Sequence, residues 1–127
     1  MIDVACAIII NERKEILVTQ RSASMKLSLK WEFPGGKIEK DESAEACLIR
    51  EIKEELDINI IIKQALKPNE YHYNDFSIRL IPFICEITSG EIKLTEHAAY
   101  IWLQKDKLGE LDWAEADIST AQYLISL

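Results

Sequence analysis

Three glutamates with helical spacing could bind a divalent metal ion. Glu51, Glu54 and Glu55 stand at positions i, i+3 and i+4, so they would share one face of a helix. Like charges at this spacing oppose helix formation by about 0.2–0.5 kcal/mol per pair, and Lys53 would lie on the far side. Hard oxygen ligands suit Mg²⁺ or Mn²⁺, commonly with a substrate phosphate completing the shell. The cluster predicts metal-assisted phosphate chemistry, although an acidic cluster alone is more often a solvated helix face.

The residues around the cluster predict the helix that would position it. A stripe of apolar residues with a spacing of four lies beside the acidic face, and it consists of Ala44, Leu48, Ile52 and Leu56. Such a stripe anchors one edge of a helix in a core. Asp41 or Ser43 is a suitable N-cap for this helix.

A tight bend is predicted just before the helix. Pro34 fixes its own φ, whereas Gly35 and Gly36 allow backbone conformations closed to other residues. Such a bend exposes carbonyl oxygens, which are good ligands for Mg²⁺.

The order of these residues resembles the Nudix box, G-x5-E-x7-R-E-U-x-E-E-x-G-U, in which U is aliphatic. The match begins at Gly36, passes through Glu42 and ends with the run from Arg50 to Ile58. It departs only at Asp57, where the family usually has Gly, and Asp tolerates the left-handed backbone that is common after a helix. The preceding W-E-F-P-G-G-K-I-E is similar to the MutT branch of the family.

The resemblance implies a metal site for Mg²⁺, with Mn²⁺ as the alternative. Its ligands would be the carbonyl of Gly35 and the carboxylates of Glu51, Glu54, Glu55 and Glu96. Arg50 would orient Glu51, and Glu42 would pair with Arg50.

The resemblance also implies a general base. MutT-type enzymes carry a Glu six residues before a Trp ahead of the last strand, and Glu96 stands six residues before Trp102. A loop carboxylate suits a base that closes onto metal and water only when substrate is bound. His97 is the alternative base.

Four residues are expected to bind substrate. In the MutT branch an Arg in the place of Arg21 contacts phosphate, and we expect Phe33 and Lys37 to contribute to the same site. Asp117 matches an Asn that reads oxidised guanine, but it could instead be the N-cap of the last helix. An ionised Asp117 would only accept hydrogen bonds. Cytosine and guanine both offer such donors, and the W-E-F…A-D-I wording is similar to the CTP pyrophosphohydrolase relatives of MutT. This resemblance implies cytosine nucleotides, including those with a modified 5-position, with oxidised dGTP as the next candidate.

The implied reaction is hydrolysis of a nucleoside triphosphate to a monophosphate and pyrophosphate. Water attacks phosphorus while metal ions neutralise the phosphate oxygens. One alternative is another Nudix activity, above all hydrolysis of 5′-triphosphorylated RNA or of another nucleoside-diphosphate-linked substrate. The second alternative is a non-catalytic nucleotide-binding module, against which the intact Arg50–Glu51 and Glu54–Glu55 pairs speak.

Length and composition restrict the number of domains, the partners and the cellular location that we expect. The 127 residues predict one domain over 1–127, and the net charge of −7 argues against a duplex nucleic-acid surface. No signal peptide and no apolar run of membrane length are present, so we expect a cytoplasmic protein without a membrane partner, either a monomer or a homodimer. The three separated cysteines are expected to be buried free thiols.

The expected fold is α+β, and the resemblance implies an α/β/α sandwich with a central mixed sheet. The apolar patterns predict a hairpin of residues 2–10 and 16–18, and an antiparallel pair of 70–73 with 77–88 whose second strand alternates between two faces. Further strands are expected at 58–65, 91–94 and 98–103, and a closing helix at 116–127.

Overall fold

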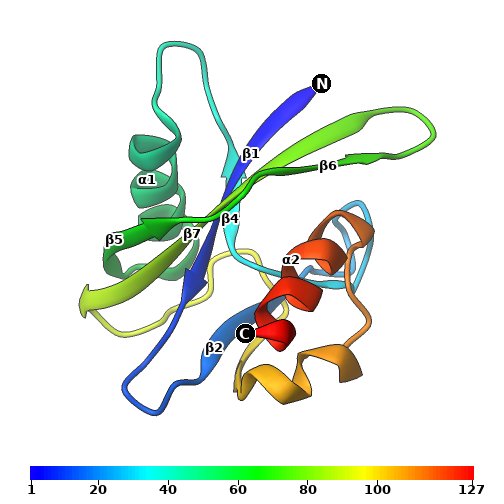
Figure 1. Cartoon of the computed structure of the whole chain (residues 1–127). Helices are drawn as coiled ribbons and strands as arrows, with labels where there is room; N and C mark the ends of the chain where they lie inside the picture. The colour runs from blue at the N-terminus through cyan, green and yellow to red at the C-terminus, as the bar shows by residue number, and fades with distance from the viewer.

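A five-stranded mixed sheet forms the centre of the computed structural model, which describes all 127 residues (Figure 1). Its strands follow the order β4 (Gly35–Lys37), β1 (Ile2–Ile9), β7 (Ser77–Ser89) and β5 (Asn59–Ala65), while β6 (Asn69–His72) also pairs with β7. Strands β1 and β7 run parallel, and the other pairs are antiparallel. The predicted mixed sheet and the β6–β7 pair are therefore confirmed.

A second, three-stranded sheet has the order β3 (Trp31–Glu32), β2 (Ile16–Gln20) and β8 (Ala99–Leu103). The prediction that the first two strands form a hairpin is wrong, because β1 and β2 are joined only by the bridge between Ile10 and Ile16. From Ala5 to Ile9 the side chains of β1 are buried on both faces, so its buried backbone N–H and C=O groups need a strand partner on each edge. It finds them in β4 and β7.

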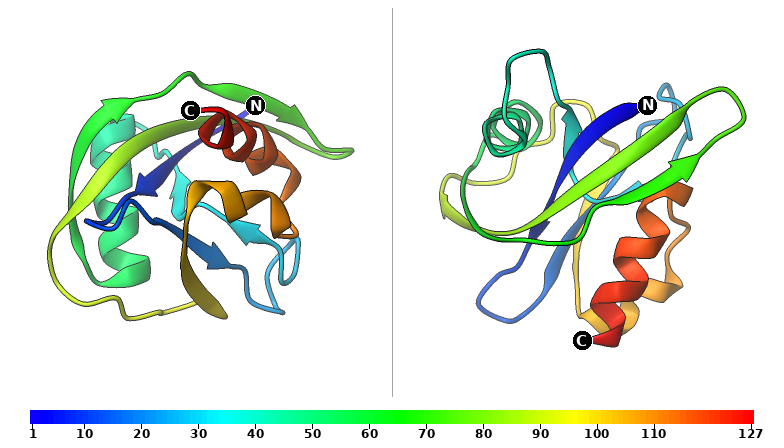
Figure 2. Two further views of the ribbon diagram at one scale, coloured as in Figure 1. Left: turned by 60° about the horizontal axis from the view of Figure 1, so that its bottom comes forward. Right: turned by 45° about the horizontal axis from the view of Figure 1, so that its top comes forward.

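Helices cover the two faces of the larger sheet (Figure 2). Helix α1 (Ala44–Leu56) lies on one face, and α2 (Glu115–Ser126) lies with the 3₁₀ helix η1 (Lys105–Glu110) on the other. Strand β1 contributes Ala5, Ala7 and Ile9 to the core under α1, and Cys6 and Ile8 to the core under α2. This alternation confirms the predicted α/β/α arrangement.

Helix α1 begins and ends as the sequence predicts. Ser43 is the N-cap, and its hydroxyl accepts a hydrogen bond from the Ala46 amide at 3.0 Å. Asp57 ends the helix in the left-handed conformation with φ of 55°. Burial of Leu48 and Ile52 contributes about 1.5–3 kcal/mol each, which outweighs the repulsion among the neighbouring carboxylates.

Residues 91–94 do not form the expected strand. Their backbone instead runs along the end of α1, where the Lys93 amide donates to the Leu56 carbonyl at 2.9 Å. Ile92 and Leu94 pack against the core under α1, so the apolar pattern reports burial rather than strand pairing.

The three cysteines are free and buried, as predicted. Neither helix has the length and apolar character that crossing a membrane would require.

Candidate active site

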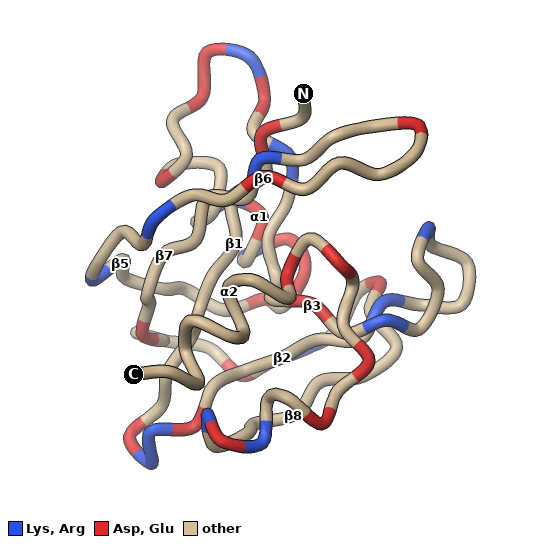
Figure 3. The backbone as a smooth tube through the Cα atoms, turned by 45° about the vertical axis from the view of Figure 1, so that its right-hand side comes forward, with Lys and Arg blue, Asp and Glu red and all other residues tan.

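A pocket of about 620 Å³ opens between the two sheets, and both helices contribute to its wall. Every site residue predicted from the sequence lines it except Arg50, namely Arg21, Phe33, Gly35, Lys37, Glu51, Glu54, Glu55, Glu96 and Asp117. Figure 3 shows acidic positions of α1, β3 and the start of α2 gathered at the middle of the molecule. The pocket thus combines one strongly acidic wall with three cationic side chains, Arg21, Lys26 and Lys37.

The segment from Trp31 to Lys37 crosses from one sheet to the other and forms the floor of the pocket. Its first part pairs with β2 and its last part with β1, and between them the Pro34 carbonyl accepts a hydrogen bond from the Ala7 amide at 2.8 Å. A β-carbon at Gly35 would overlap the Ala5 carbonyl, and one at Gly36 would overlap the Glu51 carboxylate. Glycine at these two positions therefore lets the loop lie directly against β1 and the acidic face of α1.

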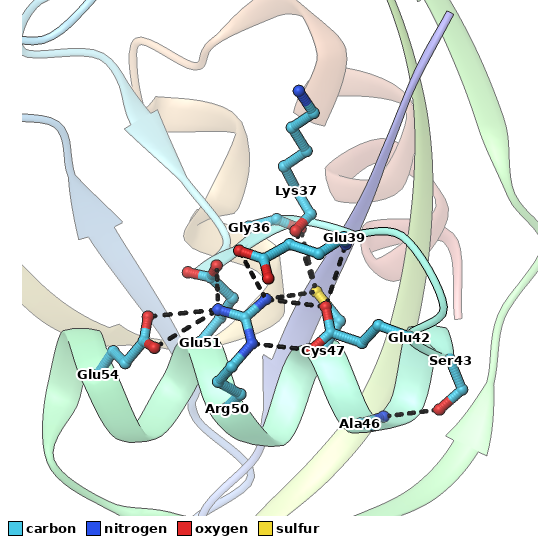
Figure 4. Close-up of polar contacts among 10 residues, drawn as sticks. All are labelled: Gly36, Lys37, Glu39, Glu42, Ser43, Ala46, Cys47, Arg50, Glu51 and Glu54. Carbon is cyan, nitrogen blue, oxygen red and sulfur yellow. Dashed lines mark hydrogen bonds and ion pairs between the residues drawn. The ribbon is translucent and has the colours of Figure 1, made fainter.

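Arg50 organises the acidic face from behind the pocket (Figure 4). Its Nε and Nη2 atoms donate to the two carboxylate oxygens of Glu42, both at 2.8 Å. Its Nη1 atom lies 2.9 Å from Glu51 Oε1 and 3.4 Å from Glu54 Oε2. The hydrogen bonds between Arg50 and Glu42 lower the pKa of Glu42 to about 2. The predicted pairing of Arg50 with both Glu42 and Glu51 is present in the geometry.

Glu55 is the buried member of the cluster. Only 12% of its side chain is exposed, and its Oε2 atom is buried without a hydrogen-bond partner. Burial raises its pKa to about 10, and the nearby carboxylates of Glu32 and Glu51 add to the shift. A cation beside Glu55 would reverse this effect and stabilise its charged form.

The donor set fits a divalent metal ion, although it does not form a closed shell as the side chains stand. No three His, Cys, Asp or Glu groups converge as a metal cluster. Glu51 and Glu54 instead contact Arg50, and Glu96 is exposed at the pocket rim. The unpartnered oxygen of Glu55 and the all-oxygen donors around it match the preferences of a hard cation.

Asp117 does not cap α2. The N-cap position is held by Ala114, and Asp117 is the third residue of the helix. Its buried Oδ2 atom accepts a hydrogen bond from the Phe33 amide at 2.9 Å. Burial raises the pKa of Asp117 well above its ordinary value, and the nearby Glu32 acts in the same direction. Asp117 therefore tends toward the neutral carboxyl, which can donate as well as accept hydrogen bonds, contrary to the ionised form assumed from the sequence.

Glu32 was not predicted as a site residue, yet it lines the same pocket as the predicted residues. Its side chain pairs with Arg21 at 2.8 Å and with His97 at 2.9 Å. His97 is buried by these contacts, with 2% of its side chain exposed, so its geometry suits a bracing role better than that of a base. The available signal in the sequence was a carboxylate between two aromatic residues, Trp31 and Phe33. The partners of Glu32, however, stand 11 and 65 residues away along the chain.

An aromatic wall on the β6–β7 turn was also missed. Tyr73 and Phe76 stack with their ring centroids 4.8 Å apart, and both line the pocket. The hydroxyl of Tyr73 accepts a hydrogen bond from the Ala116 amide at 3.0 Å. This contact fixes the turn against the start of α2, beside Asp117.

The protein-family model described as the NUDIX domain matches residues 1–124 of this chain. This chain belongs to the Nudix family. It is 32% identical over 127 residues to the CTP pyrophosphohydrolase of Escherichia coli K12, which covers the whole chain and 93% of that relative. It is 38% identical over 90 residues to the 8-oxo-dGTP diphosphatase of the same organism, which covers 71% of the chain and 70% of that relative.

The Nudix fold is confirmed by solved structures. The MutT protein of Methanosarcina mazei matches with a TM-score of 0.88 and 26% identity, over 97% of this chain and 91% of that one. Nudix hydrolases generally need a divalent metal, which agrees with the acidic wall of the pocket. The acidic helix α1 is thus the helix of the Nudix box, and its carboxylates line the pocket between the two sheets.

Proposed function

We propose that this Nudix protein hydrolyses nucleoside triphosphates to a monophosphate and pyrophosphate, with Mg²⁺ as its metal. The observation that carries the proposal is the shared pocket: the carboxylates of the Nudix helix, Arg21 and Asp117 all line one space large enough for a nucleotide. The relatives named as nucleotide pyrophosphohydrolases support the reaction class.

The acidic wall would hold the metal through Glu51, Glu54, Glu55, Glu96 and the Gly35 carbonyl. When bound, Mg²⁺ would neutralise charge on the phosphate oxygens and assist deprotonation of the attacking water. Arg50 would keep the Glu51 carboxylate against Gly36 through the contact at 2.9 Å. Mn²⁺ offers the same preference for oxygen ligands and is the natural substitute.

Glu96 would accept the proton from water. It is exposed on the segment before β8 and lines the pocket, so it can approach the substrate without disturbing the core. Arg21 would hold the phosphates, because a guanidinium offers several donors to phosphate oxygens. Lys37 would add a second positive charge from the floor of the pocket.

Phe33 and Asp117 would define the base site. The ring of Phe33 packs against Trp113 with centroids 4.8 Å apart, and its amide fixes the Asp117 carboxyl. Cytosine nucleotides remain the first candidate, supported by the relative that matches over the whole chain. A neutral Asp117 can donate to a carbonyl oxygen, which cytosine offers at O2 and guanine at O6. Oxidised dGTP is the second candidate, supported by the relative named as an 8-oxo-dGTP diphosphatase.

The test is a panel of CTP, dCTP, 5-substituted dCTP, dGTP, 8-oxo-dGTP and 5′-triphosphorylated RNA with Mg²⁺ in ¹⁸O-labelled water. The expected products are a nucleoside monophosphate and pyrophosphate that carries the label. Label in inorganic phosphate beside a diphosphate would exclude this bond cleavage. Binding of nucleotides without turnover would favour a non-catalytic module, and preference for RNA would favour the RNA pyrophosphohydrolase.

A further inference from the structure

The carboxylate of Glu32 connects two other side chains that line the pocket, those of Arg21 and His97. Its Oε1 atom accepts a hydrogen bond from Arg21 Nη1 at 2.8 Å, and its Oε2 atom lies 2.9 Å from His97 Nε2. Only 16% of the Glu32 side chain is exposed. A carboxylate can accept through both oxygens at once, so one side chain serves both contacts.

Arg21, Glu32 and His97 lie near the same end of the three-stranded sheet. Strand β2 lies in the middle, and Gln20 at its end pairs with Trp31 of β3 on one side and Ala99 of β8 on the other. Arg21 leaves this end of β2, and His97 approaches it ahead of β8. The Ala98 amide donates to the Gln20 carbonyl at 2.9 Å, which fixes the approach of the His97 segment.

Arg21 is held in place by two of its donors. Besides the bond to Glu32, its Nε atom donates to the Lys26 carbonyl at 2.6 Å. A guanidinium has five N–H donors, so others remain for a phosphate. A side chain fixed before substrate arrives loses less conformational entropy on binding.

His97 extends the arrangement to the acidic wall. Its Nε2 atom, which faces Glu32, also lies 3.6 Å from Glu55 Oε1. A carboxylate accepts hydrogen bonds, so Nε2 is the donor in the contact with Glu32 Oε2 at 2.9 Å. The imidazole is buried between the two carboxylates and limits the orientations open to the Glu55 side chain.

We propose that Glu32 is a positioning residue that fixes Arg21 for the substrate phosphates and, through His97, holds Glu55 for the metal ion. The proposal rests on the proposed function, since Arg21 and Glu55 have their roles there. A glutamine at this position has the same shape but only one acceptor oxygen, and its amide would face a donor of Arg21 or His97. One of the two contacts is therefore lost.

The experiment compares the wild-type protein with Glu32→Gln. Binding of Mn²⁺ alone is measured by electron paramagnetic resonance, and kcat and KM are measured on the best substrate of the panel. We expect the Kd of Mn²⁺ to rise about tenfold and kcat/KM to fall about tenfold or more, as for residues that orient metal ligands. Asp112→Asn is the matched control, because it removes the exposed Lys30–Asp112 pair next to β3 without touching the pocket.

Double mutants test whether Glu32 acts through its two partners. With Arg21→Gln and His97→Asn already present, adding Glu32→Gln should change kcat/KM and the Kd of Mn²⁺ by no more than about twofold, the usual error of additivity. If Glu32→Gln does not fold, Arg21→Gln and His97→Asn are measured singly, and each tests one of the two contacts of Glu32. Arg21→Gln should raise KM and leave the Kd of Mn²⁺ unchanged, whereas His97→Asn should raise that Kd.

An unchanged Kd of Mn²⁺ in Glu32→Gln overturns the proposal, even if the melting temperature falls. A normal Kd in His97→Asn overturns it equally. Failure of the functional proposal itself would be distinguishable, because the wild-type protein would then hydrolyse no nucleotide of the panel.

Discussion

The backbone amide of Phe33 donates a hydrogen bond to Asp117 Oδ2 at 2.9 Å, and this contact joins the crossing segment to the first turn of α2. One carboxyl oxygen of Asp117 is therefore already used, and the other is the atom available to a base. Because burial favours the neutral carboxyl, that atom can carry a hydrogen.

Asp117→Asn is expected to preserve substrate preference. The amide oxygen of Asn can accept from Phe33 while its NH₂ group donates to the base, as a neutral carboxyl would. The ratios of kcat/KM between CTP, dCTP and 8-oxo-dGTP should stay within about threefold, less than the usual effect of an unpaired buried group.

Asp117→Ala is the contrasting variant. It leaves the Phe33 amide unpaired and should lower stability by about 1–3 kcal/mol. It should also change the kcat/KM ratios by about tenfold or more. Ratios that change in Asp117→Asn as much as in Asp117→Ala would show that Asp117 acts as an ionised carboxylate.

Glu54→Gln should remove activity without unfolding the protein. Its side chain is 59% exposed, and its contact with Arg50 at 3.4 Å contributes at most about 1 kcal/mol to stability. With Mg²⁺, kcat should fall by at least about a hundredfold, since even residues behind metal ligands change activity by about 10–100-fold. Glu45→Gln, an exposed change in the first turn of α1, is the control and should keep normal kcat.

The metal-free protein should lose stability as pH rises. The pKa of Glu55 is raised in the folded state from 4.5 to about 10, so its stabilising contribution is complete below pH 4.5 and is lost toward pH 10. Thermal unfolding in EDTA should show this loss, and Glu55→Gln should flatten it. Added Mg²⁺ should raise the melting temperature most at high pH, where Glu55 can ionise. An equal slope in both proteins would contradict the assignment.

Glu42 should have the opposite pH dependence. Its pKa is lowered from 4.5 to about 2, so the stability that it contributes is present above pH 4.5 and disappears as pH falls toward 2. Acid unfolding of Glu42→Gln should therefore lack part of the wild-type loss in this range. Glu39→Gln is the comparison, because Glu39 lies 3.9 Å from Arg50 and is largely exposed, and it should unfold like the wild-type protein.

The residues of the Nudix helix and its bend could be predicted from sequence because their determinants are local. The N-cap at Ser43, the left-handed end at Asp57 and the stripe of Leu48 and Ile52 all act within a few positions of one another. The predicted residues of the pocket wall, such as Arg21 and Glu96, came from a family pattern rather than from local physics.

The remaining features depend on pairing between distant segments. Strand β1 was expected beside β2 because turn residues separate them, yet burial on both faces places it between β4 and β7. Glu32 could not be given a role, since its partners Arg21 and His97 approach only when β2, β3 and β8 align. The neutral form of Asp117 depends on burial that no single segment specifies.

The parallel pairing of β1 with β7 has a consequence for synthesis on the ribosome. Ile2 of β1 faces Ile78, and Ile9 faces Cys85, so β1 must wait for β7, which is made later. Until then the apolar residues of β1 lack their central partner, and contacts so distant along the chain form slowly. Nascent chains stalled before β7 has emerged should be cleaved readily by protease, and resistance should appear once β7 is free to pair. Folding of this enzyme is therefore completed only after β7 is free to pair with β1.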